Sequence, residues 1–239
     1  MQQQRYLFFS IIIPAHNEEH YITNTIERLL ALDYPMENYE VIAVENGSND
    51  RTYEKAKQLE KLNVKVFTSH IKGVSAAKNT GIAKLSQKTD WVIFLDADTI
   101  LQKNFLKNLN NFLIINLNRN YAVGTTEIKP LSEKITAKFW FAFYNLGHRL
   151  TKTSYSLQIV KYSLLKKVHF DERLVMGEDL KLIRDASQYG RFFYFLTKDV
   201  YTSTRRFEQE GWLKVFFHWI FVSLLPYRIQ KYFTYKTIR

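Results

Sequence analysis

The sequence predicts an α/β fold, a single Rossmann-like, mainly parallel sheet flanked by helices. Residues 1–125 alternate short, apolar, β-rich runs with amphipathic stretches, which is the pattern of βα units. The predicted strands cover residues 8–13, 40–44, 64–67 and 91–95, and the predicted helices cover residues 18–32, 50–62 and 75–85. Asn17 and Ser48 are the predicted N-caps of the first two helices.

The second half of the chain is less regular. Residues 126–207 mix aromatic helices with short strands, and no linker rich in Pro, Gly or Ser separates them from residues 1–125, so we expect one domain over 1–207. Residues 208–239 form a basic, aromatic tail. Within the tail, residues 212–225 are too short for a membrane span, and core packing is favoured over membrane contact. The apolar run near the N-terminus contains Ser10 and ends at Pro14, which is not the pattern of a signal peptide.

The composition restricts the chemistry without choosing the partner. A formal charge of +11 suits a nucleic acid, an anionic membrane surface or phosphorylated small molecules. Aromatic residues make up 15% of the chain, and many lie beside Lys and Arg, which also suits lipid headgroups. The sequence contains no cysteine, which excludes disulfides, thiolate metal sites and thiol nucleophiles.

Polar clusters follow three of the four predicted strands. They cover residues 14–18, 45–50 and 96–98. Ligands of open α/β sheets bind at the carboxyl ends of the strands, so we expect the three clusters to meet on one edge.

Asp96 and Asp98 emerge together from the fourth strand, and three interpretations are open. Both could cap the following turn. They could instead hold Mg²⁺ or Mn²⁺, because two close carboxylates repel each other unless a cation compensates them. The third interpretation is a haloacid-dehalogenase-like phosphatase with Asp96 as nucleophile and Asp98 as general acid. That motif belongs on a first strand, whereas three strands precede this one.

Five motifs occur in the order seen in family 2 glycosyltransferases. They are Pro14-Ala15-His16-Asn17-Glu18, Glu45 to Asp50, Gly73 to Gly81, Asp96-Ala97-Asp98 and Gly177-Glu178-Asp179-Leu180. From Phe8 to Phe207 the chain resembles that family, and the resemblance implies a GT-A (nucleotide-diphospho-sugar transferase) fold. It makes 1–207 the catalytic domain, with a nucleotide-sugar-binding half at 1–125 and an acceptor-side half at 126–207. The implied donor is a nucleotide-diphosphate sugar, with a UDP-sugar favoured over a GDP-sugar.

The resemblance also assigns roles to residues on the donor side. The implied nucleotide-binding residues are Pro14, Ala15, His16, Glu18, Glu45, Asn46, Lys78, Asp96, Ala97 and Asp98. Asp98, with Asp96 as its companion, is the implied ligand of Mn²⁺ or Mg²⁺. Glu45-Asn46 replaces the more usual pair of aspartates, and Lys78 stands where Arg is common and lacks its bidentate fork.

On the acceptor side, the resemblance makes Asp179 the general base of an inverting transfer and gives Glu178 a supporting role. Without it, either acid could simply cap the helix that follows. Arg205 and Arg206 are expected in a loop that contacts the diphosphate or the acceptor, since arginine suits phosphate oxygens. The Gln-x-x-Arg-Trp motif of processive synthases is absent, which favours transfer of a single sugar.

The sequence therefore predicts a metal-dependent glycosyltransferase acting on a hydroxyl acceptor in cell-envelope or lipid-linked glycan synthesis. We expect a cytoplasmic protein that contacts the inner face of the membrane peripherally through its C-terminal segment, with no nucleic acid partner. The alternatives are the phosphatase and a non-enzymatic basic module that binds nucleic acid or membrane.

Overall fold

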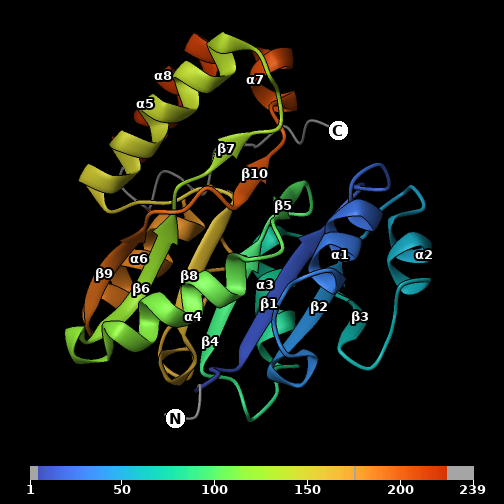
Figure 1. Ribbon diagram of the computed structural model, residues 1–239. Helices are drawn as coiled ribbons and strands as arrows, with labels where there is room; N and C mark the ends of the chain where they lie inside the picture. Colours follow the sequence, from blue (N-terminus) through green and yellow to red (C-terminus); the bar gives the residue numbers. More distant parts are fainter. Residues whose placement is uncertain (1–4, 175, 225–239) are drawn as a thin grey trace.

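The computed structural model describes residues 5–174 and 176–224, which form one seven-stranded sheet, a three-stranded sheet and flanking helices (Figure 1). The large sheet has the order β3-β2-β1-β4-β8-β6-β9. Its strands are β1 (Phe9–Ala15), β2 (Tyr39–Glu45), β3 (Val64–Thr68), β4 (Trp91–Leu95), β6 (Tyr121–Thr126), β8 (Leu157–Lys161) and β9 (Arg191–Phe195). Only β8 runs antiparallel to its neighbours, so the prediction of a mainly parallel sheet is confirmed.

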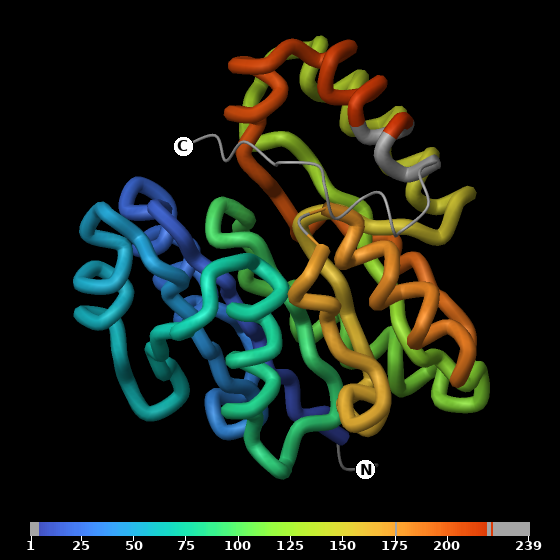
Figure 2. The backbone as a smooth tube through the Cα atoms, turned by 180° about the vertical axis from the view of Figure 1, so that it is seen from behind, coloured from blue at the N-terminus to red at the C-terminus, as the bar shows by residue number. Residues whose placement is uncertain are grey.

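Helices cover both faces of this sheet. They are α1 (Ile22–Leu30), α2 (Thr52–Lys57), α3 (Val74–Ile82), α4 (Phe105–Ile115), α5 (Ile135–Thr151), α6 (Glu178–Ser187), α7 (Arg205–Glu210) and α8 (Trp212–Leu224), with 3₁₀ turns η1 (Met36–Asn38), η2 (Leu117–Arg119) and η3 (Tyr162–Leu164). Side chains alternate between the faces along a strand, so Ile11 of β1 packs with α1 and α4, whereas Ile12 packs with α3 and α6. Figure 2 shows α3 and α6 from behind.

The small sheet lies beyond the carboxyl end of the large one. It consists of β5 (Thr99–Leu101), β10 (Val200–Thr202) and β7 (Lys129–Pro130), in that order. The chain continues from β7 into α5, and from β10 into α7 and α8, so three helices form a cap above this edge (Figure 1). Residues 126–207 share the large sheet with residues 1–125, as expected from the lack of a linker.

The predicted N-caps are wrong. Helix α1 begins at Ile22, five residues beyond Asn17, and α2 begins at Thr52, four residues beyond Ser48; the N-cap residues of both helices make no side-chain cap bond. Instead, the Ser48 hydroxyl accepts the Asn17 N–H at 2.9 Å, and the Asn17 side chain accepts the Asn49 N–H at 2.7 Å. The two residues therefore join the loops after β1 and β2, which local helix signals do not reveal.

The C-terminal stretch is only partly a core helix. Val215 of α8 is buried, whereas Leu213, Phe217 and Phe221 are exposed. In the part of the chain that the structure describes, no helix is long and apolar enough to cross a bilayer. Residues 225–239 of the predicted tail lie outside the described residues.

Candidate active site

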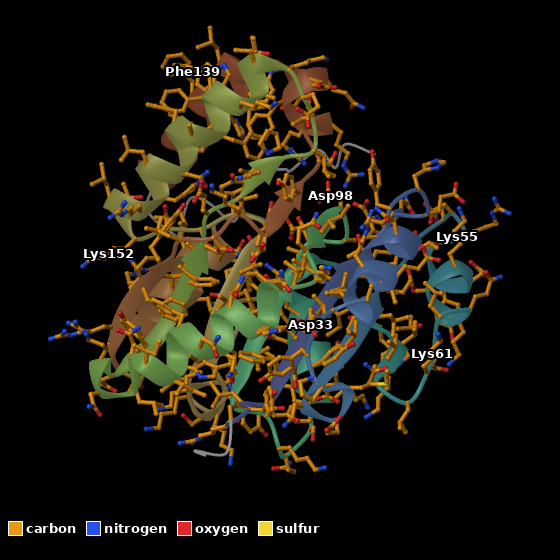
Figure 3. All side chains as sticks on the ribbon, viewed as in Figure 1. Asp33, Lys55, Lys61, Asp98, Phe139 and Lys152 are labelled. Atoms are coloured by element: carbon orange, nitrogen blue, oxygen red, sulfur yellow. The ribbon has the colours of Figure 1, made fainter. Side chains whose placement is uncertain are left out.

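The three polar clusters meet at one edge of the large sheet, as the sequence predicts. Strand β1 pairs in parallel with both β2 and β4, with Ala15 opposite Glu45. The Asn46 N–H donates to the Ala15 carbonyl at 2.9 Å, and Asp98 follows the end of β4 next to the small sheet (Figure 3). The loops after three parallel strands therefore surround one site.

Arg205 joins two of the predicted donor-site residues. Its Nη2 atom donates to Glu18 Oε1 at 2.5 Å, its Nε atom lies 3.0 Å from Asp98 Oδ2, and its guanidinium lies 4.6 Å from the centre of the Tyr21 ring. We call Arg205, Glu18 and Asp98 the Arg205 cluster. Burial is the main cause that raises the pKa of Asp98 to about 6; Arg205 opposes this and the Glu18 carboxylate adds to it.

Lys78 joins the two predicted catalytic acids. Its Nζ atom donates to Asp179 Oδ1 at 2.6 Å and lies 3.6 Å from Glu178 Oε1, and its side chain is only 2% exposed. We call these three residues the Lys78 cluster. Burial lowers the pKa of Lys78, but attraction to the surrounding carboxylates outweighs it and raises the pKa above its ordinary value. The ammonium group also lies 4.7 Å from the centre of the Phe170 ring.

Two glycines place the Lys78 cluster. A Cβ atom at Gly81 would lie 2.6 Å from Ile12 Cγ2, so glycine lets α3, the helix that carries Lys78, approach β1 closely. Gly177 has φ 77°, in the left-handed region that favours glycine, and it immediately precedes Glu178 and Asp179 at the start of α6. Burial, followed by repulsion from Asp179, raises the pKa of Glu178 to about 7.

Asp96 interacts electrostatically with residues of both clusters. Burial is the main cause that raises its pKa to about 6; Lys78 opposes this, and the carboxylates of Asp98 and Asp179 add to it. Its N–H donates to the Ser156 carbonyl of the loop before β8 at 3.0 Å. The carboxylates of Asp98 and Asp179 therefore both act on Asp96.

Other predicted nucleotide-binding side chains hold the loops of the site together. The Asn46 side chain donates to the Ile71 carbonyl and accepts the Gly73 N–H, each at 2.6 Å, and Glu45 accepts the Ser48 N–H. A role of Glu45 and Asn46 in reading the base stays a prediction.

The remaining predicted residues are also placed around the site edge. Pro14 and Ala15 end β1, His16 is half-buried directly after it, and the Ala97 carbonyl accepts the Thr25 hydroxyl at 2.6 Å. Arg206 lies 3.2 Å from Glu210, one turn along α7. The charge of Arg206 also acts on the site, because it lowers the pKa of Asp98.

The two cation–carboxylate pairings could not be read from the sequence. Lys78 and Asp179 are 101 residues apart, and Arg205 and Glu18 are 187 residues apart. The family resemblance implies that Lys78 contacts the nucleotide. In the structure its ammonium group contacts Glu178 and Asp179 of α6. The rings of Phe170 and Tyr21 contact Lys78 and Arg205, and neither aromatic residue belongs to a recognised motif.

A divalent cation fits the acidic pair at the end of β4. Asp96 and Asp98 supply the hard carboxylate oxygens that Mg²⁺ and Mn²⁺ prefer, and the raised pKa values show that both ionised side chains lack full compensation. Over residues 5–174 and 176–224, no group of three or more His, Cys, Asp or Glu side chains could hold a metal. Phosphate oxygens would complete the coordination of an ion held by this pair.

The fold is that of the GT-A class. A model of glycosyl transferase family 2 matches residues 10–174, and the chain belongs to that family. The predicted family and fold are confirmed, and the phosphatase and the non-enzymatic module are set aside. The family suggests a divalent metal in general.

Three known proteins illustrate the likeness. The chain is 34% identical to the minor teichoic acid biosynthesis protein GgaA of Bacillus subtilis, over 80% of this chain and 48% of GgaA. It is 29% identical to a dolichyl N-acetyl-α-D-glucosaminyl phosphate glycosyltransferase of Methanococcus voltae, over 73% of this chain and 60% of that protein. The crystal structure of Staphylococcus aureus TarS residues 1–349 with UDP-GlcNAc matches with a TM-score of 0.70 and 25% identity, over 83% of this chain and 59% of that one. The chain thus spans 60% or less of each of these proteins.

Proposed function

We propose that the protein transfers a single sugar, with inversion, from a UDP-sugar to a hydroxyl group of a cell-envelope or lipid-linked glycan. One observation carries the proposal: Asp96 and Asp98 lie at the carboxyl end of β4 in the same electrostatic site as Asp179, at the start of α6. A donor held at β4 would present its sugar toward the acid of α6. The complex of TarS with UDP-GlcNAc supports the choice of nucleotide, and the teichoic acid and dolichyl relatives support the acceptor class.

On the donor side, Asp98 and Asp96 would hold Mn²⁺ or Mg²⁺. When bound, that ion supplies positive charge near the leaving diphosphate. Glu18, in the loop after β1, would accept hydrogen bonds from the nucleoside. Arg205 carries a fixed fork of donors that suits phosphate oxygens, so it would exchange its contact with Asp98 for contacts with the diphosphate. Arg206, on the same helix, would add positive charge at the diphosphate or the acceptor.

On the acceptor side, Asp179 would take the proton of the attacking hydroxyl. Lys78 binds Oδ1 of Asp179 and so fixes the orientation of the carboxylate, which leaves Oδ2 to receive the proton. Glu178 shares the same lysine and supports this arrangement. Since Lys78 is buried and belongs to α3, the base is oriented before the acceptor arrives.

Calorimetric titration with UDP and GDP, each with and without Mn²⁺, tests the donor site. UDP with Mn²⁺ should bind most tightly, and absence of binding by any nucleoside diphosphate would overturn the proposal. A panel of UDP-sugars assayed for slow hydrolysis then identifies the sugar without knowledge of the acceptor. We further propose that the enzyme works at the inner face of the membrane, since its acceptor class includes lipid-linked glycans.

A further inference from the structure

Helix α5 carries apolar residues on two opposite faces. Its inner face packs on the protein through Ala137, Phe141 and Tyr144, which are all buried. Its outer face carries Ile135, Phe139, Phe143, Leu146 and Leu150, which are 85%, 67%, 44%, 55% and 73% exposed. Steps of three and four residues place these five side chains in one stripe along the helix. An exposed apolar stripe of this length on a soluble surface marks an interaction site.

Helix α8 continues the same surface. Val215 is buried on its inner side, while Leu213, Phe217 and Phe221 are 60%, 63% and 54% exposed at spacings of four. The helices lie side by side and run in the same direction, because Trp140 stacks on Trp212 and, one turn later on each helix, Tyr144 meets Phe216. Both helices bury their inner sides, so the two stripes form one outward surface. We call these eight exposed residues the apolar face.

Basic side chains border the apolar face. Lys138 and Arg149 flank the stripe on α5, Lys152 follows its end, and Lys214 lies beside Leu213 on α8; all four are exposed. Figure 3 shows Phe139 on the outer side of α5 and Lys152 at its far end. The nearby acid Glu133 precedes the helix and pairs with Lys138. From Gly211 to Arg239 the sequence contains no Asp or Glu.

We propose that the apolar face binds a lipid surface that contains anionic headgroups. Aromatic and aliphatic side chains bordered by Lys and Arg match the interfacial region of such a membrane, where apolar burial and attraction to anionic lipids add together. The positive border favours an anionic partner over a second copy of this chain, which would bring the same charges. The cap also lies at the carboxyl end of the sheet, where Asp98 is found, so a membrane-borne acceptor would lie on the side of the active site (Figure 1). This inference deepens the proposed function, but binding to lipid can be measured without any donor.

The first test is sedimentation of the full chain with phosphatidylcholine vesicles, with and without phosphatidylglycerol. The protein should bind the anionic vesicles, and F139E/F217E should lower the partition coefficient about tenfold or more. The matched control is L62E/I115E, since Leu62 and Ile115 are 93% and 82% exposed but lie away from the cap; it should bind as the unchanged protein does. UDP-sugar hydrolysis should persist in both variants, which separates this test from that of the proposed function. Equal binding by F139E/F217E, or no binding by the unchanged protein, would overturn the proposal.

A second test uses the absence of cysteine from the sequence. F139C and L62C, each labelled with an environment-sensitive dye, report on one site at a time. The label at residue 139 should shift to the blue only when anionic vesicles are added, and the label at residue 62 should not shift. A blue shift at residue 139 without vesicles would mean that the protein itself covers the face. If light scattering then shows a dimer that F139E/F217E dissociates, the occupant is a second copy and the lipid proposal is wrong.

Discussion

The Lys78 cluster and the Arg205 cluster use the same device, one cation between two carboxylates, in different structural settings. Lys78 is 2% exposed and belongs to α3, which packs against β1 in the core. Arg205 is 16% exposed and begins α7, a helix of six residues in the cap. Displacing Lys78 would open the core, whereas Arg205 begins a short helix outside it, so loss of its contact with Asp98 would leave the core closed. The comparison indicates that the proposed base is held fixed while the donor site is free to exchange its cation.

The largest expected effect comes from a substitution in the Lys78 cluster. Replacing Asp179 with Asn keeps a side chain that Lys78 can bind but removes the proton acceptor, so the rate of transfer should fall about a thousandfold. Donor affinity measured by calorimetry should change little, because the proposed donor site lies at the ends of β1 and β4. The control is D185N on the same helix, which removes only the partly exposed pair with Lys181. Full transfer by D179N would remove Asp179 as the base.

Removing the charge of Lys78 should lower the stability of the protein as well as its activity. K78M leaves Glu178 and Asp179 without their buried partner, which should lower the free energy of unfolding by about 3 kcal/mol in urea titrations. K181M breaks an ion pair that is more exposed and should cost less than about 1 kcal/mol. K78R restores the charge and should recover part of the stability. If K78M unfolds at the same urea concentration as the unchanged protein, Lys78 does not stabilise the fold.

These clusters also mark the limit of what the sequence could predict. The first four strands and the three polar strand ends followed from apolar runs, since those patterns are local. Asn17 and Ser48 looked like caps because Asn and Ser favour both caps and turns, and only the fold shows that they join two loops. The partners of Lys78 were hidden for a different reason: the contact depends on how closely α3 approaches β1, which one sequence does not encode in any spacing.

In the Arg205 cluster, one substitution should strengthen the binding of Mn²⁺ and weaken the binding of the donor. In R205A, Asp98 loses the guanidinium that competes for it, so Mn²⁺ alone should bind about tenfold more tightly in calorimetry. The same variant loses donors to the diphosphate, so the KM for the UDP-sugar should rise by about tenfold. R191A is the control, because Arg191 is exposed at the start of β9, away from the carboxyl ends of the strands, and it should leave Mn²⁺ affinity nearly unchanged. Weaker binding of Mn²⁺ to R205A would show that Arg205 supports the site and does not compete for it.

The smallest expected effect concerns Asp96, which lies between the clusters. Burial raises its pKa to about 6, so its contribution to stability is fully present below the unfolded-state value of about 3.9 and is lost as the pH rises through 6. At pH 7.5 the ionised side chain therefore opposes folding, and D96N should raise the free energy of unfolding by about 1 kcal/mol. The advantage should shrink at pH 5, where the carboxyl group is largely protonated in the folded protein. D33N is the control, since Asp33 is exposed and pairs with Lys107 away from the site. If D96N is more stable at pH 7.5 but does not bind Mn²⁺ and UDP, Asp96 serves binding and lowers the stability of the fold. If D96N is less stable, Lys78 fully compensates the charge of Asp96.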